Sequence, residues 1–259
     1  MKKNMYSFAI LCLLFAAIPG IWNSGLSCNF SIIDNKLFVF SSRFNNRLFY
    51  HVDTRGDKLV ALTFDDGPDP VYTPRALDIL DQHQIKATFF VVGEQAEYYP
   101  DLLLQAVERG HEIENHTFTH PDLTRESYNQ VVLEILKTQQ VIENITKRSP
   151  VYFRPPKRLT NRQVTEMVEQ QGLKTVLWTV GVESQESPTV QNMAERVINH
   201  ARPGCIILAH DGRLDRSRTL EALPLIIEGY QQMGYRFVTL EELMQHQHEP
   251  EYTMVESII

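Results

Sequence analysis

The sequence predicts an α/β fold, a distorted barrel of about seven parallel strands, and two features of the chain support this prediction. From residue 58 onward, short apolar runs alternate with longer runs whose apolar residues recur at helical spacing. Because strands separated by helices of this length need crossover connections, the strands are expected to be parallel. An open doubly wound sheet is the alternative architecture for the same pattern.

Seven apolar runs are the expected strands, and six amphipathic runs are the expected helices. Pro74 suits a first helical turn, and Gly110, Gly172 and Gly234 mark helix ends. The expected strands are 59–64, 87–92, 112–115 (the weakest), 151–153, 174–180, 205–209 and 235–240. The expected helices are 73–82, 100–109, 126–146, 162–171, 190–201 and 219–233.

The first 28 residues resemble an export signal. Two lysines precede an unbroken apolar run at 8–18. That run is shorter than the about 20 residues that a membrane span needs. An uncleaved N-terminal anchor over residues 6–22 and lipidation at Cys28 are the alternatives to cleavage. All three place the rest of the chain outside the cytoplasmic membrane, in the periplasm, at the cell surface or secreted, with any membrane association confined to this segment.

Three further segments follow residue 28. Residues 29–57 are expected to be a lead-in, either a small hairpin of 36–40 with 48–52 or an extended stretch across the barrel. Residues 58–245 form the predicted main domain, and residues 246–259 form a polar tail that is expected to fray.

Composition excludes several classes of protein. Hydrophobic residues make up 43% and charged residues 22%, which excludes a disordered chain, a collagen-like fibre and a multi-span membrane protein. A net charge of −7 argues against a nucleic-acid partner, which usually meets a basic face. Three cysteines are too few for a disulfide scaffold or a four-thiolate zinc module.

Adjacent carboxylates end the first expected strand. Functional side chains of α/β barrels gather where strands end, and Asp65 and Asp66 lie at such a point. Gly67 allows unusual backbone angles, so both carboxylates can turn toward one cavity. A solvated turn is the structural alternative, because Asp-Gly-Pro is common turn chemistry.

Polar residues also follow three other expected strands. His116 and His120 are four residues apart and can bind one metal ion, although two surface histidines are the simpler alternative. Two imidazoles and one carboxylate would leave positions open for water and substrate, as catalytic zinc requires. His210 is a candidate general acid. Arg154 would hold a carboxylate ionised, or would be a surface cation beside a turn.

The order of four motifs resembles one known family. These are TFDDG at 63–67, HTFTH at 116–120, RPP at 154–156 and LAH at 208–210. Together they resemble the polysaccharide deacetylases with a NodB-type domain, carbohydrate esterase family 4, over residues 58–243. The resemblance implies a distorted (β/α) barrel that removes N- or O-acetyl groups from sugar polymers with a divalent metal, most often zinc.

The resemblance also implies a role for each motif residue. It implies a metal held by Asp66, His116 and His120. It implies Asp65 as general base, oriented by Arg154, and His210 as general acid. Trp178 and Leu208 would shape an apolar pocket for the acetyl methyl group, and the N–H of Lys157, which follows Pro156, would help to bind the oxyanion.

Three positions depart from the family pattern. Lys157 and Arg158 stand where Tyr-Gly is usual, and two extra cations suggest an acidic or phosphate-bearing group in the substrate. Gly181 stands where an Asp usually tunes the catalytic histidine, and Glu183 is a candidate substitute. Glu114 replaces the small residue that usually precedes the metal histidines.

Three functions are compatible with these residues. The leading one is an exported, metal-dependent deacetylase of an N-acetylated glycan such as peptidoglycan or a chitin-like oligomer. A hydrolase of small cyclic amides on the same barrel is one alternative, which the export signal disfavours. A glycan-binding protein with decayed catalysis is the other, favoured by Gly181 and disfavoured by the complete set of motif residues.

Overall fold

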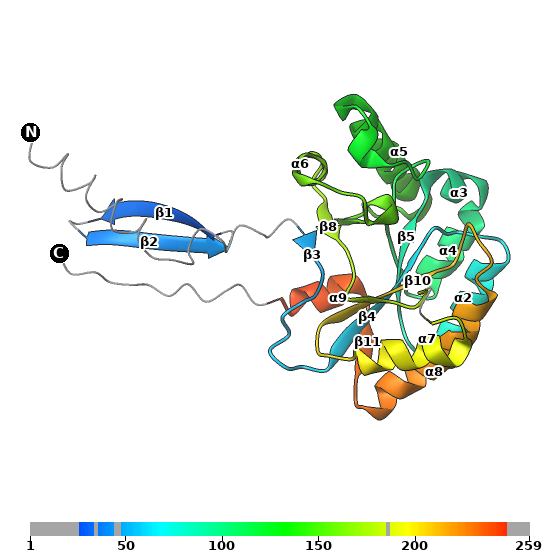
Figure 1. Ribbon diagram of the computed structural model, residues 1–259. Helices are drawn as coiled ribbons and strands as arrows, with labels where there is room; N and C mark the ends of the chain where they lie inside the picture. Colours follow the sequence, from blue (N-terminus) through cyan, green and yellow to red (C-terminus); the bar gives the residue numbers. More distant parts are fainter. Residues whose placement is uncertain (1–25, 34–35, 44–47, 185–186, 248–259) are drawn as a thin grey trace, which may run out of the picture. The chain divides into compact units, whose positions relative to one another are not determined.

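The computed structural model describes residues 26–33, 36–43, 48–184 and 187–247 (Figure 1). Two units divide the chain, one made of residues 1–46 with 249–259 and the other of residues 47–248. Most of the predicted export segment and of the polar tail lies outside the described residues. No helix in the described part of the chain is long and apolar enough to cross a membrane.

The first unit contains a two-stranded antiparallel sheet. Strand β1 (Leu26–Ile33) pairs with β2 (Lys36–Arg43) along its whole length. The hairpin predicted between 36–40 and 48–52 is therefore wrong. Only two residues separate β1 from β2, and such short connections favour pairing between sequence neighbours.

The second unit is built on a curled sheet of nine strands, in the order β3-β8-β7-β6-β5-β4-β10-β9, with β11 beside the first half of β4. All of its ladders are parallel. The strands are β3 (Leu48–Phe49), β4 (Leu59–Asp65), β5 (Thr88–Val91), β6 (Glu112–Asn115), β7 (Tyr152–Phe153), β8 (Lys174–Val176), β9 (Val180–Gly181), β10 (Cys205–His210) and β11 (Arg236–Val238). The predicted parallel α/β barrel is confirmed. It is distorted because no ladder among the described residues joins β3 to β9.

Helices follow the strands; most connect one strand to the next on the outside of this sheet, and the one after β11 packs against the interior cluster (Figure 1). They are α2 (Tyr72–Gln82), α3 (Gly93–Tyr98), α4 (Pro100–Glu108), α5 (Tyr128–Thr146), α6 (Arg162–Gln170), α7 (Val190–Asn199), α8 (Ser217–Gln232) and α9 (Leu240–Gln245). Two single turns of 3-10 helix are η1 (Leu123–Arg125) and η2 (Pro156–Arg158). The short helices α3 and α9 were not predicted, because each spans only six residues.

The expected strand at 174–180 is divided into β8 and β9. The break falls at Leu177–Thr179, where the backbone has other partners. The guanidinium of Arg154 donates to the carbonyl oxygens of Val176 and Leu177. The backbone also changes partner across the break, since the Leu177 N–H donates to Phe49 and the Thr179 N–H donates to Ile206.

Strand β4 shows how the fold aims side chains at the barrel interior. All seven of its residues are buried, as expected for a central strand covered on both faces. Val60, Leu62 and Phe64 pack in the cluster between sheet and helices, whereas Leu59 and Ala61 pack in a second cluster inside the barrel. Because side chains alternate along a strand, the last residue of β4, Asp65, faces the interior.

Candidate active site

The candidate site lies at the carboxyl ends of β7, β6, β4 and β10, which belong to one continuous part of the sheet with β5 between β6 and β4. Asp65 ends β4 and His210 ends β10, which is hydrogen-bonded to β4. His116 follows β6, and Arg154 follows β7. The predicted catalytic and metal-binding residues therefore come together at one edge of the sheet.

One carboxylate and two imidazoles converge on a common point. Asp66 Oδ1 lies 3.1 Å from His120 Nε2 and 3.6 Å from His116 Nε2. One ligand atom from each of the three residues lies within 4.8 Å of the others. His116 Nδ1 is 2.7 Å from the carbonyl oxygen of Arg154, so that nitrogen donates, and Nε2 is the nitrogen that faces Asp66.

The donor set fits a divalent metal ion such as zinc. Asp66 Oδ1 is buried and has no hydrogen-bond partner in the described structure. Burial acts to raise the pKa of Asp66, but contacts from His116 and His120 outweigh it and hold that pKa far below its usual range. Burial lowers the pKa of His120. The carboxylate is therefore charged and His120 tends to be neutral, which are the forms that bind metal.

Asp65 is held by the buried arginine that the sequence predicted for it. Arg154 Nη1 donates to Asp65 Oδ1 at 2.7 Å and to Thr63 Oγ1 at 2.8 Å. The guanidinium is fully buried and lies 4.0 Å from the centre of the Phe90 ring. The other carboxylate oxygen, Asp65 Oδ2, faces the metal histidines and lies 3.8 Å from His116 Nε2.

Glu183 occupies the place beside the candidate general acid. Its Oε2 lies 3.0 Å from His210 Nδ1, and its Oε1 accepts a hydrogen bond from Thr219 Oγ1 at 2.7 Å. Burial acts to lower the pKa of His210, but the Glu183 carboxylate outweighs it and raises that pKa above the ordinary value. The structure thus brings together the two residues that the sequence could only suggest as a pair.

Arg216 is a residue of this site that sequence reasoning missed. Its Nη2 donates to Asp66 Oδ2 at 3.1 Å, and its Nη1 lies 3.9 Å from Glu183 Oε1. It precedes α8 and belongs to a run that also contains Arg213 and Arg218. No pattern in the sequence distinguishes the middle arginine from the other two.

Trp178 and Leu208 lie together near the catalytic residues. Both approach the position that a Cβ on Gly181 would occupy, with Trp178 Nε1 at 3.7 Å and Leu208 Cδ2 at 3.9 Å. The Arg154 guanidinium carbon lies 5.8 Å from the Trp178 ring centre. Gly181 therefore leaves room between two apolar side chains beside the site.

The η2 turn carries the predicted oxyanion donor. Pro156 is buried, whereas Lys157 and Arg158 are exposed and both have positive φ, at 57° and 60°. The Arg158 guanidinium carbon lies 5.5 Å from the ring centre of Trp178 and 5.7 Å from that of Tyr50. Arg158 is thus close to Trp178, one of the two residues predicted to receive the acetyl methyl group.

Gly67 has a different role from the one predicted. Its φ is not positive; Asp66 adopts the left-handed conformation, with φ 76°. A Cβ on Gly67 would lie 2.5 Å from the carboxylate oxygens of Asp211. Asp211 is fully buried and accepts a hydrogen bond from Thr73 at 2.5 Å, and burial raises its pKa to about 7. Glycine is needed at 67 for space rather than for backbone freedom.

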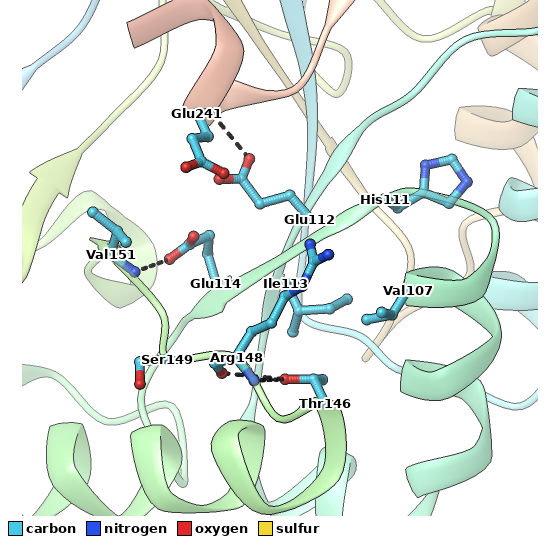
Figure 2. A pocket seen from close by; sticks show the side chains of 10 residues that line it. All are labelled: Val107, His111, Glu112, Ile113, Glu114, Thr146, Arg148, Ser149, Val151 and Glu241. Carbon is cyan, nitrogen blue, oxygen red and sulfur yellow. Dashed lines mark hydrogen bonds between the residues drawn. The ribbon is translucent and has the colours of Figure 1, made fainter. Parts of the chain in front are cut away.

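A cavity away from the candidate site lies at the amino end of β6 (Figure 2). It has a volume of about 500 Å³ and is lined by Val107, His111, Glu112, Ile113, Glu114, Thr146, Arg148, Ser149, Val151 and Glu241. Glu114, the departure noted in the sequence, accepts hydrogen bonds from the N–H groups of Val151 and Tyr152 at 2.9 and 2.6 Å. It does not join the metal residues.

Comparisons with known proteins agree with this site and fold. Residues 52–176 match the family model described as polysaccharide deacetylase. A peptidoglycan-N-acetylglucosamine deacetylase of Bacillus cereus is 39% identical over 194 residues, which cover 74% of this chain and 91% of the relative. A chitooligosaccharide deacetylase of Azorhizobium caulinodans is 36% identical over 194 residues, which cover 70% of this chain and 92% of the relative.

A solved structure extends the likeness to three dimensions. A peptidoglycan N-acetylglucosamine deacetylase in complex with 4-naphthalen-1-yl-N-oxidanyl-benzamide superposes with a TM-score of 0.74 and 31% identity, covering 78% of this chain and 96% of that one. The chain therefore belongs to the polysaccharide deacetylase family with a NodB-type domain, carbohydrate esterase family 4. The resemblance stated from the four motifs is confirmed.

Proposed function

We propose that this polysaccharide deacetylase is an exported, metal-dependent enzyme that hydrolyses N-acetyl groups of a carboxylate-bearing glycan such as peptidoglycan. One observation carries the proposal. At a single edge of the sheet, a three-ligand metal set lies with a carboxylate held by Arg154 and an imidazole held by Glu183. Metal-assisted amide hydrolysis needs these two proton-transfer groups on either side of the reacting carbon.

Asp66, His116 and His120 would hold the metal ion. One carboxylate and two neutral imidazoles suit zinc and leave coordination positions open. When bound, such an ion lowers the pKa of a bound water to about 7 and polarises a carbonyl group. His116 is kept in the binding tautomer by the carbonyl oxygen of Arg154.

Asp65 is the proposed general base. Arg154 neutralises and fixes Oδ1, so Oδ2 is the oxygen left to take a proton from the attacking water. The arginine cannot turn away, because Val176, Leu177 and Thr63 accept its other hydrogen bonds. The base is therefore held in position before substrate binds.

His210 is the proposed general acid for the departing amine. Glu183 occupies Nδ1, which leaves Nε2 to deliver the proton. The raised pKa of His210 favours its protonated form near neutral pH. The Lys157 N–H would donate to the oxyanion, and Trp178 with Leu208 would receive the acetyl methyl group in the space beside Gly181.

The cations of η2 support an anionic glycan as substrate. Arg158 has no carboxylate within ion-pair distance in the described structure and lies against two aromatic rings at the edge of the pocket. Sugars pack on aromatic faces, and a guanidinium binds carboxylate with paired hydrogen bonds. Peptidoglycan carries free carboxylates on its peptide stems, whereas chitin-like oligomers are neutral.

The test is acetate release by the purified chain from peptidoglycan and from N-acetylglucosamine oligomers, with zinc or with a chelator. Release that needs zinc and is lost in Asp65→Asn is the expected result. Zinc binding without release from any N-acetylated glycan would overturn the proposal and favour a glycan-binding protein. The contact between Glu183 and His210 argues against that alternative, because decayed catalysis has no need of a paired acid.

A further inference from the structure

We propose that Arg216 is a positioning residue that presents Asp66 to the metal through a single oxygen and joins the metal carboxylate to the general-acid pair. The inference rests on the proposed function, since it assumes that Asp66, His116 and His120 bind a metal ion. Arg216 lies outside all four motifs that identify the family.

The two oxygens of Asp66 have separate partners. Oδ2 accepts a hydrogen bond from Arg216 Nη2 at 3.1 Å. Oδ1 has no hydrogen-bond partner in the described structure and faces His116 and His120. A carboxylate can bind metal through one oxygen or both, and a donor fixed on one oxygen leaves the other as the ligand.

The guanidinium is itself held in place. Arg216 Nε donates to the carbonyl oxygen of Gly212 at 2.8 Å, and the side chain is only 7% exposed. Gly212 packs so closely on the Asp66 backbone that a Cβ there would collide with the Asp66 carbonyl oxygen. The loop between β10 and α8 therefore fixes both the arginine and the aspartate that it contacts.

Each of the two adjacent aspartates thus has its own arginine. Arg154 holds Asp65 from β7, and Arg216 holds Asp66 from the β10–α8 loop. Each carboxylate is therefore oriented by its own fixed donor, and the two can take different tasks, Asp65 as proton acceptor and Asp66 as metal ligand.

The third contact extends the network to the acid. Arg216 Nη1 lies 3.9 Å from Glu183 Oε1, while the other oxygen of Glu183 meets His210. One planar guanidinium thereby faces three acceptors in different directions, which a lysine ammonium on a flexible stem does not reproduce. We expect Arg216→Lys to recover part of the function and not all of it.

The experiment measures zinc affinity of the metal-free chain by competition with a chromophoric chelator. Arg216→Gln is expected to weaken zinc binding by about 10–100-fold, as loss of residues that orient metal ligands commonly does. Arg216→Lys should weaken it less. Arg218→Gln is the matched control: it removes the same charge two residues away, where the side chain donates to the Pro188 carbonyl oxygen. Its zinc affinity should stay within twofold of the parent chain.

Thermal unfolding in the presence of chelator shows which variants are folded. If Arg216→Gln does not fold, the zinc affinity of Arg216→Lys is the test. A folded variant at 216 that binds zinc as tightly as the parent overturns the inference and leaves the proposed function intact. A parent chain that binds no zinc overturns the proposed function and this inference with it.

Discussion

The carboxylates that surround the candidate site and the two glutamates at the amino end of β6 are buried in different ways. At the carboxyl end, Asp65, Asp66 and Glu183 each lie within 4 Å of a cationic side chain or histidine. At the amino end, Glu112 and Glu114 have no ion pair among the described residues and rely on backbone N–H groups and Thr88. Figure 2 shows this second pair facing the cavity beside Glu241.

The contrast shows that burial alone does not set the direction in which the pKa of a carboxyl group shifts. Burial alone raises the pKa of a carboxyl group, and at Glu114 it raises the pKa well above the ordinary value. Asp66 is also buried, yet its partners hold its pKa far below the ordinary value. The pKa values of Asp66 and Glu183 beside the site are therefore lowered by their partners, whereas burial raises the pKa values of Glu112 and Glu114.

The largest expected effect is on the rate of acetate release and concerns Asp65, beside the proposed metal ligands. Asp65→Asn keeps the size of the side chain and removes the proton acceptor, so kcat/KM for acetate release should fall by about 10²–10⁴-fold. Zinc affinity should change little, because Asp65 is not among the three ligands. Asp101→Asn, exposed on α4, is the control and should retain full activity. A residual rate within threefold of the parent would remove Asp65 from the mechanism.

The second-largest expected effect is on the pH dependence of activity and concerns His210, which lies beside Glu183. Glu183→Gln removes the charge that raises the pKa of His210, so burial then lowers that pKa. The acid is active when protonated; hence the alkaline limb of kcat/KM should move to lower pH by roughly one unit. The rate at lower pH should change far less. An unmoved alkaline limb, beside an unchanged Glu195→Gln control on α7, would exclude Glu183 from tuning the acid.

A stability measurement tests the raised pKa of Glu114 at the amino end of β6. Glu114→Gln mimics the protonated carboxyl group and can still accept from Val151 and Tyr152. Because the pKa of Glu114 is raised in the folded state, the parent chain loses stability as pH rises above the unfolded value. The variant should therefore be more stable than the parent by on the order of 1 kcal/mol at pH 8 and by less at pH 5.

Chemical denaturation at the two pH values measures that difference. Glu108→Gln, exposed on α4, should show no such dependence on pH. A Glu114→Gln variant that is less stable than the parent at pH 8 would mean that Glu114 is ionised there and stabilised by partners.

The smallest effect concerns a cation that has no carboxylate partner in the described structure. Arg158→Gln should lower kcat/KM on peptidoglycan by about threefold to fivefold at low salt, since exposed ion pairs contribute under about 1 kcal/mol. The loss should fade as ionic strength rises. Activity on neutral N-acetylglucosamine oligomers should stay the same. An equal loss on both substrates would show that Arg158 supports the loop rather than an anionic group.

The motif residues of the site could be predicted because strand ends of a parallel sheet meet at one edge. Asp65, His116 and His210 follow recognisable apolar runs, and chain order alone placed them together. The contacts made from loops could not be predicted in the same way. Arg216 reaches Asp66 across 150 positions of sequence through a loop that has no periodic pattern.

Predictions from the local sequence were also wrong for two features of the backbone, the run 174–180 and Gly67. The run 174–180 has the composition of one strand, but a buried arginine binds two of its carbonyl groups and its N–H groups change partner across the break. Gly67 suited a turn with unusual backbone angles, but what requires glycine there is the neighbouring Asp211. In both cases a partner distant in sequence decides the outcome, and single-chain patterns carry no information about it.

The close packing of Gly67 on Asp211, and of Gly212 on Asp66, limits how the enzyme can be altered. Each loop holds a glycine against an aspartate of the other, so a side chain added at either glycine displaces the opposite loop. The two loops therefore form one structural unit. A library that aims to change glycan preference should leave positions 66–67 and 211–212 untouched and vary 157–158, where the side chains are exposed.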